Sequence, residues 1–425
     1  MREIVLKGLD ESVWYEKILD KLPTYVLKND KVKGTFMALG VKYGSIHQEF
    51  KNNNEVKYHK VPSGIAHFIE HLKFYEPDGT TATDFFNQYG SDVNAFTTFE
   101  YTCYHVYTTQ AIKENLEHLL EFVLTPCFNK KNVNKERNII LEELGMQKDS
   151  PDSQIFYKNY ENVFHKYKYK EIITGEKEDI KKITLEDIEL IFDTFYHPEN
   201  MFLIVTGNVN PYDIFKVTEN QLKKKKIPNY RHPKMKKIKE PVNVVKEKCE
   251  ITGNVENTKV KITIKTPISN FKMVDPIELR VIMSLILNSN FGSTSDLKEE
   301  LMEKELIHYL SFNRHFCGEY VLLTVSMETS YPEYAIKEVK NQFKKLKMTE
   351  ENFKRKVNSS IATLVLNYDD IQNVNEMMQE EIISYGEIVD DLKEHIESIT
   401  FDKVLQVMDK IDVKNMEVTI LKPKE

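Results

Sequence analysis

Two histidines and a glutamate lie within five residues in the segment GIAHFIEHLKF, residues 64–74. Apolar residues recur through this segment at helical spacing, so it is predicted to form a helix. Positions i, i+3 and i+4 of a helix share one face, which places His67, Glu70 and His71 together. Two imidazoles one turn apart can bind one Zn²⁺, and the glutamate between them can then act as a general base. The order HxxEH is the inverted form of the HExxH zinc-protease motif.

The same spacing has a simpler interpretation. An exposed helix face with two surface histidines would look identical in sequence, and chance gives HxxEH in such a chain on the order of a few times in a hundred. A zinc peptidase also needs a third protein ligand and an open coordination position. The motif alone therefore does not establish a zinc site.

The segment NKERNIILEELGMQ offers candidates for the third ligand. Glu136 and Glu143 are two helical turns apart and share a face, whereas Glu142 points about 100° away from Glu143. Ile139 and Ile140 are expected to anchor this helix through apolar packing. The spacing alone does not decide which acid would bind a metal ion.

Length and composition limit the kind of protein that can present these residues. The chain has 425 residues, and a prior of roughly 150 residues per domain allows two or three domains. Its hydrophobic fraction of 41% is too high for a disordered protein. The net charge of −7 gives no indication of nucleic-acid binding. Arginine is scarce, so an arginine used in chemistry must come from a short list.

The compartment is predicted from what the sequence lacks. The N-terminal segment MREIVLKGLDESVWYEK has no apolar core of signal-peptide length, and no apolar run approaches the roughly 20 residues of a membrane span. Four cysteines are scattered without CxxC spacing, so buried, reduced thiols are expected. We therefore expect a soluble, cytoplasmic protein without a membrane anchor.

The two halves of the chain resemble each other. Residues 181–207 and 397–423 share an Ile-Thr pair near their start (Ile183-Thr184 and Ile399-Thr400), continue as an amphipathic helix, pass through Asn-Met and finish as an apolar strand. This repeat predicts an α+β protein with two homologous domains, residues 1–221 and 246–425. The lysine- and proline-rich residues 222–245 are predicted to be a solvated linker. A basic nucleic-acid arm is the less favoured alternative for this segment.

Local signals within the halves predict several helices. Thr184 and Asp187 have the spacing of a capping box, and Asp275 followed by proline marks a helix start. Residues 331–347 and 350–385 are predicted to form two further helices.

Four motifs in order resemble the pitrilysin-type zinc peptidases, a group that includes insulin-degrading enzyme and mitochondrial processing peptidase. They are HFIEH, YGSDVNAFTTFEYTCYHV, ERNIILEEL and FYHPENMFLIVTGNV, and they cover most of residues 30–210. The second half matches more weakly, through ILNSNFGSTSDLKEELMEKELIHY. The length is similar to that of small bacterial members that pair two chains. The resemblance implies that each domain is a sheet covered by helices and that the chain forms half of a clamshell peptidase chamber.

The resemblance also implies roles for individual residues. His67 and His71 would be zinc ligands and Glu70 the catalytic base. The third ligand in the family pattern corresponds to Glu143, and Glu136 would support the site from behind the ligands.

Asn94 and Ala95 fall on the strand that, in the family, takes up the substrate backbone as an added strand. The alternative, to which we give equal weight, is that each residue belongs to an ordinary hairpin strand without a role in substrate binding.

One departure from the family pattern affects the expected activity. The family completes its site with an arginine and a tyrosine seven residues apart; Tyr309 fits the tyrosine, but Met302 stands at the arginine position. Loss of such a donor would reduce the rate on the order of 10²-fold or more. Either the chain is a weak or inactive peptidase, or a partner subunit supplies the arginine.

The intact zinc motif favours the second explanation. We expect a zinc-dependent endopeptidase subunit that acts on short or unfolded peptides, paired with a homologous partner in a heterodimer, with a homodimer as a further option. The main alternative is a non-catalytic member that binds peptides or scaffolds a complex. A metal-independent binding module would require the four ordered motifs to be coincidental.

Overall fold

The computed structural model describes residues 1–424, which form two compact units. The first unit contains residues 1–144, 172–237 and 365–391, and the second contains residues 145–171, 238–364 and those from Leu392 onward. Each unit is a β-sheet covered by helices, which confirms the predicted α+β class. The sequence repeat predicts two contiguous domains. In the structure, residues 145–171 belong to the second unit and residues 365–391 belong to the first.

A seven-stranded sheet forms the centre of the first unit, in the order β1-β2-β3-β9-β4-β8-β7. Its pairs are antiparallel except for the parallel pair β3 and β9. Strand β7 therefore lies at one edge of the sheet. Its strands are β1 (Arg2–Leu6), β2 (Glu11–Ile18), β3 (Leu22–Lys28), β4 (Thr35–Val41), β7 (Asp92–Thr97), β8 (Thr102–Thr108) and β9 (Met201–Gly207). A small sheet of β5 (Glu49–Lys51), β6 (His59–Lys60) and β10 (Lys234–Met235) completes the unit.

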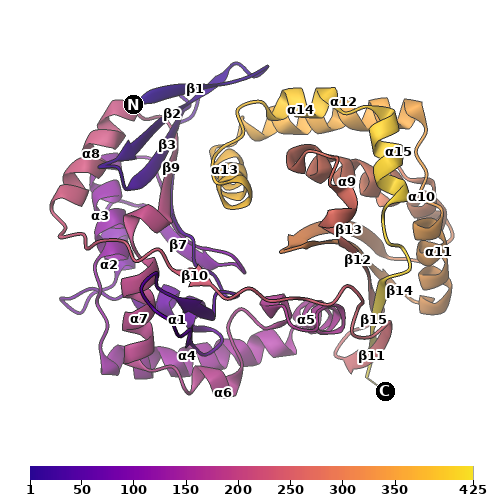
Figure 1. Cartoon of the computed structure of the whole chain (residues 1–425), viewed down its shortest axis with the longest axis horizontal. Helices are drawn as coiled ribbons and strands as arrows, with labels where there is room; N and C mark the ends of the chain where they lie inside the picture. The colour runs from indigo at the N-terminus through magenta and orange to yellow at the C-terminus, as the bar shows by residue number, and fades with distance from the viewer. Residues whose placement is uncertain (425) are drawn as a thin grey trace. The chain divides into compact units, whose positions relative to one another are not determined.

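Helices cover both faces of the seven-stranded sheet. Along β4, Met37 and Leu39 point into the main core, whereas Phe36 and Ala38 pack with Ile371 on the opposite face. Figure 1 shows α3 and α8 on one side of this sheet and α13 on the other. This is why β4 and β9 are buried along their whole length. The helices of the unit are α1 (Ile65–Lys73), α2 (Ala82–Gln88), α3 (Ile112–Leu124), α4 (Lys130–Asp149), which continues into the second unit, α6 (Lys177–Ile180), α7 (Leu185–Phe195), η2 (Pro198–Asn200), α8 (Pro211–Lys223) and α13 (Ile371–Tyr385).

The second unit has a five-stranded sheet in the order β11-β15-β12-β14-β13. Its strands are β11 (Lys248–Gly253), β12 (Thr258–Pro267), β13 (Tyr309–Cys317), β14 (Tyr320–Thr329) and β15 (Met416–Pro423). Helices α9 and α11 contact the apolar face, and α5 contacts β12 and β15. Its helices are α5 (Pro151–Val163), η1 (Lys168–Lys170), η3 (Ile268–Phe271), α9 (Pro276–Phe291), α10 (Asp296–Glu303), α11 (Pro332–Lys344), α12 (Glu350–Asn367), α14 (Leu392–Ser398) and α15 (Phe401–Asp409).

Most of the local predictions are confirmed. Thr184 forms the capping box of α7, and the Asp275 carboxylate accepts the first free backbone N–H groups of α9. All four cysteines are free thiols, and Cys103, Cys249 and Cys317 are buried as expected, whereas Cys127 is only partly buried. The single helix predicted over residues 350–385 is wrong, because α12 ends at Asn367 and the Asp370 carboxylate caps a new helix, α13. Among the described residues, no helix combines the length and apolar composition needed to cross a bilayer.

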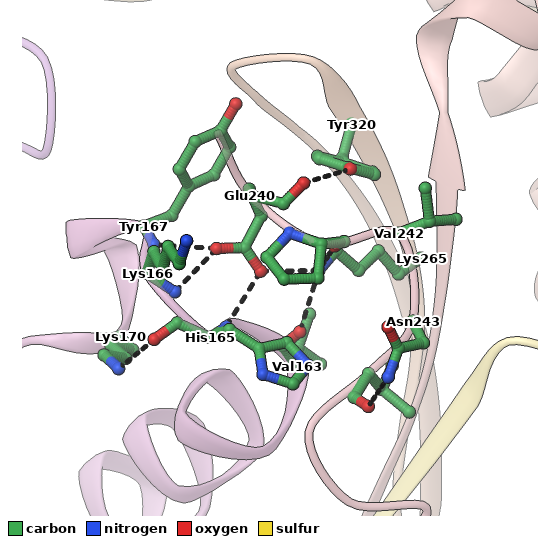
Figure 2. Close-up of polar contacts among 12 residues, drawn as sticks. Val163, His165, Lys166, Tyr167, Lys170, Glu240, Val242, Asn243, Lys265 and Tyr320 are labelled. Atoms are coloured by element: carbon green, nitrogen blue, oxygen red, sulfur yellow. Dashed lines mark hydrogen bonds and ion pairs between the residues drawn. The ribbon is translucent and has the colours of Figure 1, made fainter. Parts of the chain in front are cut away.

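The lysine-rich segment 222–245 is only partly the solvated linker that was predicted. It begins inside α8 and contributes β10, which pairs with β5. Its far end is fixed in the second unit by Glu240, whose side chain and that of Lys265 are both 0% exposed and lie 2.8 Å apart. Figure 2 shows the Glu240 carboxylate accepting backbone N–H bonds from three consecutive residues, His165, Lys166 and Tyr167. The charges of Glu240 are therefore satisfied without solvent.

Candidate metal centre

Helix α1 begins at a position that only glycine can occupy without strain. Gly64, the N-cap, has φ of 84°, and a Cβ there would lie 2.3 Å from the carbonyl oxygen of Thr174. The apolar side chains of α1 then pack into the main core of the first unit. This packing fixes the rotation of α1 and therefore the direction of its polar side chains.

The polar residues of α1 are not on an exposed face. His67 is 9% exposed and Glu70 is 8% exposed, and His71 is half-buried. The alternative of an exposed helix with two surface histidines is therefore wrong. Buried polar groups need partners, and here most of the partners come from α4 and β7.

The structure brings His67, His71 and Glu143 together, with one ligand atom of each residue within 4.8 Å of the others. The Nε2 atoms of the two histidines lie 3.5 Å and 3.4 Å from the two carboxylate oxygens of Glu143. These separations are long for hydrogen bonds. They are close to the spacing of about 3.3 Å between two ligand atoms that each lie about 2.0 Å from a tetrahedral zinc ion. The donor set and its spacing therefore fit zinc.

The packing of α4 explains why Glu143 takes this position. Ile140 and Leu144 are buried in the core, whereas Glu142 is exposed to solvent. Ile139 is 41% exposed, so the expectation that it anchors the helix is wrong; Ile140 does so. Glu143 lies at the boundary of the buried face, where its carboxylate can reach both histidines.

Glu136 contacts His71 at the ring nitrogen that is not directed at Glu143. Its Oε2 lies 3.1 Å from Nδ1 of His71, and its Oε1 accepts a hydrogen bond from the Tyr75 hydroxyl. Burial lowers the pKa of His71, but the contacts with Glu136 and Glu143 outweigh it and raise that pKa to about 9. The two carboxylates thus favour a positive charge at His71, which a proton or a metal ion can supply.

His67 has a different environment. Burial, together with the neighbouring His71, lowers the pKa of His67 to about 4, so its imidazole is neutral and keeps a lone pair available. Its Nδ1 is buried and has no hydrogen-bond partner among residues 1–424. Only His71 therefore has its ring orientation fixed by a carboxylate from behind.

Glu70 lies on the same helix between the two histidines. Burial raises its pKa to about 7, although a hydrogen bond donated by the Thr97 hydroxyl acts in the opposite direction. Thr97 was not singled out from the sequence, although it lies within the motif NAFTTFE that follows α2. A carboxyl group with a pKa near neutrality can exchange a proton efficiently.

Asn94 and Ala95 lie in β7, the edge strand whose last residue is Thr97. Asn94 is exposed and pairs with His105 in the register, and its side chain accepts a hydrogen bond from the Ala95 backbone at 2.8 Å. An edge strand leaves backbone groups open on its outer side. Thr97 connects this edge directly to Glu70.

Tyr309 and Met302 belong to the second unit, whereas the histidine–glutamate cluster lies wholly in the first. Tyr309 is the first residue of β13, and Met302 lies in the last turn of α10. Each side chain is 43% exposed.

The fold is that of a peptidase family. The profile of Insulinase (Peptidase family M16) matches residues 25–177, and that of the Peptidase M16 inactive domain matches residues 182–360. The chain therefore belongs to peptidase family M16.

Individual proteins of this family share much of the chain. The chain is 35% identical over 324 residues to the uncharacterized zinc protease YmfH of Bacillus subtilis. The aligned region covers 75% of this chain and 74% of that protein. It is 27% identical over 263 residues to the zinc protease PqqE of Helicobacter pylori, covering 60% of this chain and 57% of that one. A crystal structure described as M16-like, from Alicyclobacillus acidocaldarius, shares the fold with a TM-score of 0.92 at 23% identity, covering 99% and 100% of the two chains.

Proposed function

We propose that this chain is a zinc-dependent endopeptidase subunit that hydrolyses short or unfolded peptides. The observation that carries the proposal is the convergence of His67 Nε2, His71 Nε2 and the Glu143 carboxylate beside Glu70. Two imidazoles and a carboxylate are the protein ligands of many catalytic zinc sites and leave a fourth position open.

In this proposal each residue has a separate task. His67, His71 and Glu143 hold the zinc ion, and Glu136 keeps His71 in the tautomer that exposes Nε2. A bound zinc ion would polarise the scissile carbonyl and lower the pKa of a water molecule. Glu70 accepts a proton at its carboxylate and delivers it to the leaving amine.

The substrate backbone is proposed to pair with β7. An extended peptide can add to an exposed sheet edge through main-chain hydrogen bonds, which gives weak dependence on side chains. Asn94 and Ala95 lie at the middle of this edge, and Thr97 at its end donates to Glu70. Pairing along β7 would therefore carry a peptide toward the catalytic base.

The partner is proposed because the oxyanion donor is incomplete. Tyr309 is available as a substrate contact, but Met302 cannot donate a hydrogen bond to a developing negative charge. We therefore propose a heterodimer whose homologous partner supplies the arginine, with a homodimer as the second arrangement. A cytoplasmic location is part of the same proposal.

Met302 also favours a second candidate function. A family member without the arginine could bind peptides or scaffold a complex without cutting them. The buried Glu70 argues against this alternative, because a purely binding protein gains nothing from a carboxyl group held in a desolvated position.

Peptide cleavage separates the two candidates. The zinc-loaded chain would be assayed on a library of quenched fluorescent peptides, alone and with a homologous partner that carries the arginine. Cleavage that Glu70→Gln reduces by about 10²–10⁴-fold supports the peptidase. Zinc-loaded protein that binds peptides but never cleaves them, with or without a partner, supports the binding protein.

A further inference from the structure

A pocket of about 420 Å³ lies in the second unit, between the N-terminal end of α5 and strands β12 and β14. Its charged lining residues are Asp152, Lys259 and Lys261, and Tyr309 also lines it. All of these residues belong to the second unit. The pocket is therefore formed within one compact body.

The strand register explains why polar groups gather here. Lys261 pairs with Ser326, and Lys259 pairs with Glu328, which in turn pairs with Tyr309 of β13. Residues paired across a sheet point to the same face, so these side chains share one face. The intervening Val260 and Met327 have nearly fully buried side chains in the apolar core of the unit.

The two lysines differ in their partners. The Lys259 ammonium lies 3.2 Å from the Asp152 carboxylate and 3.4 Å from that of Glu328. The Lys261 ammonium donates to the Ser326 hydroxyl at 2.9 Å and lies 5.8 Å from the centre of the Phe156 ring. No carboxylate among the described residues is within ion-pair distance of Lys261. Lys261 thus forms no ion pair of its own among the described residues, although two ammonium groups and two carboxylates share this region.

The surroundings of Lys261 also favour an anion. Burial lowers the pKa of Lys261, the charge of Lys259 acts in the same direction, and Asp152 opposes both. The first turn of α5 contributes Asp152 and Ser153 to the lining, so the positive end of the helix dipole is directed at this region. An incoming anion would therefore meet both an ammonium that is in no ion pair and a favourable helix terminus.

We propose that this pocket is a subsite for a carboxylate of the bound peptide, held by Lys261. The carboxylate can come from an acidic side chain or from the C-terminus of the peptide, and both would form a charge-assisted hydrogen bond with the ammonium. The inference rests on the proposed function, because it assumes that peptides are the ligands. It adds a preference for acidic peptides to an activity whose backbone contacts alone would select little.

Peptide binding tests this subsite without requiring cleavage. The full-length chain carrying Glu70→Gln would be titrated with fluorescent peptides, and the affinity followed by anisotropy. One peptide pair differs by Glu against Gln at internal positions, and a second pair differs by a free against an amidated C-terminus. The acidic member of at least one pair is expected to bind about tenfold more tightly, and the pair that shows the difference identifies the source of the carboxylate.

Substitutions locate the effect. Lys261→Met is expected to remove the acidic preference, whereas Lys354→Met, at an α12 side chain that is 69% exposed, leaves it intact. Asp152→Asn provides a second test in case Lys261→Met folds poorly, because the Asp152 side chain is 84% exposed. It removes the acidic residue from the described lining and should therefore strengthen the preference for acidic peptides. Equal binding of both members of each pair overturns the subsite. So does a preference that survives Lys261→Met, or one that Asp152→Asn leaves unchanged. A Lys261-dependent preference in a chain that never cleaves peptides would support the subsite while the peptidase proposal fails.

Discussion

The Glu136 carboxylate of α4 lies 3.1 Å from Nδ1 of His71 in α1. The two residues are 65 positions apart in the sequence, and their contact joins the two helices. It leaves Nε2 of His71 directed toward Glu143. A histidine held in this way has a fixed tautomer and a more basic metal-binding nitrogen.

Glu136→Gln is expected to weaken zinc binding by about 10–100-fold without removing a ligand, because the amide no longer fixes His71 through a negative charge. Zinc affinity would be measured by competition with a chromogenic chelator. Glu142→Gln, on an exposed position of the same helix, is the matched control and should bind zinc as the wild type does. An unchanged affinity in Glu136→Gln would show that the contact has no influence on the metal.

The buried pair of Glu240 and Lys265 should contribute strongly to stability. Glu240→Gln leaves the Lys265 ammonium without its charge partner in a site where both side chains are 0% exposed. Breaking such a pair typically costs about 3–5 kcal/mol, which urea denaturation would detect as a lower free energy of unfolding.

A second ion pair in the same unit provides the comparison. Lys347 and Asp296 are also 2.8 Å apart, but their side chains are 66% and 80% exposed. Asp296→Asn should therefore lower the free energy of unfolding by no more than about 1 kcal/mol. Equal losses in the two variants would contradict the role assigned to burial.

Glu381 should make the stability of the first unit depend on pH. Burial raises its pKa from 4.5 to about 7; its Oε2 accepts a hydrogen bond from the Val389 backbone, and its Oε1 has no partner in the described chain. Below pH 4.5 the carboxyl group is protonated in both states. Between pH 4.5 and 7 the unfolded chain releases the proton while the folded chain keeps it, so stability falls as pH rises.

The size of this effect can be measured against Glu381→Gln, which does not titrate. From pH 5 to pH 7.5 the wild type should lose about 2 kcal/mol more free energy of unfolding than the variant. Glu376→Gln, on an exposed position of α13, should follow the wild type. Parallel pH profiles for the wild type and Glu381→Gln would mean that the carboxyl group is ionised in the folded chain.

Spacing within one helix was enough to predict that His67, Glu70 and His71 lie together, because helical periodicity is a local property. Spacing was not enough to choose Glu136 or Glu143 as the metal ligand, because the choice depends on which face of α4 is turned toward α1. The rotation is set by Ile140, which is buried, whereas the adjacent Ile139 is not. The resemblance to the peptidase family indicated Glu143 as the third zinc ligand. The role of Glu143 as a ligand stays a prediction.

Contacts between distant segments were beyond the sequence. Glu240 lies in a lysine-rich stretch that looks solvated, and nothing in the pattern indicates that Lys265 and three backbone N–H groups enclose it. Thr97 was likewise missed, since its contact with Glu70 depends on the packing of β7 against α1. Asp370 could have been recognised, because an aspartate before a helical run is a frequent N-cap.

His67, His71 and Glu143 are proposed to hold a zinc ion, and the zinc content of the purified chain tests this proposal most directly. The protein would be stripped with a chelator, reloaded with zinc, and measured by atomic absorption for the wild type, Glu143→Ala and Glu142→Ala. We predict one zinc ion per chain in the wild type and in Glu142→Ala, and loss of most of it in Glu143→Ala. A chain that binds no zinc, or that retains it after Glu143→Ala, would show that these three residues do not form the zinc site.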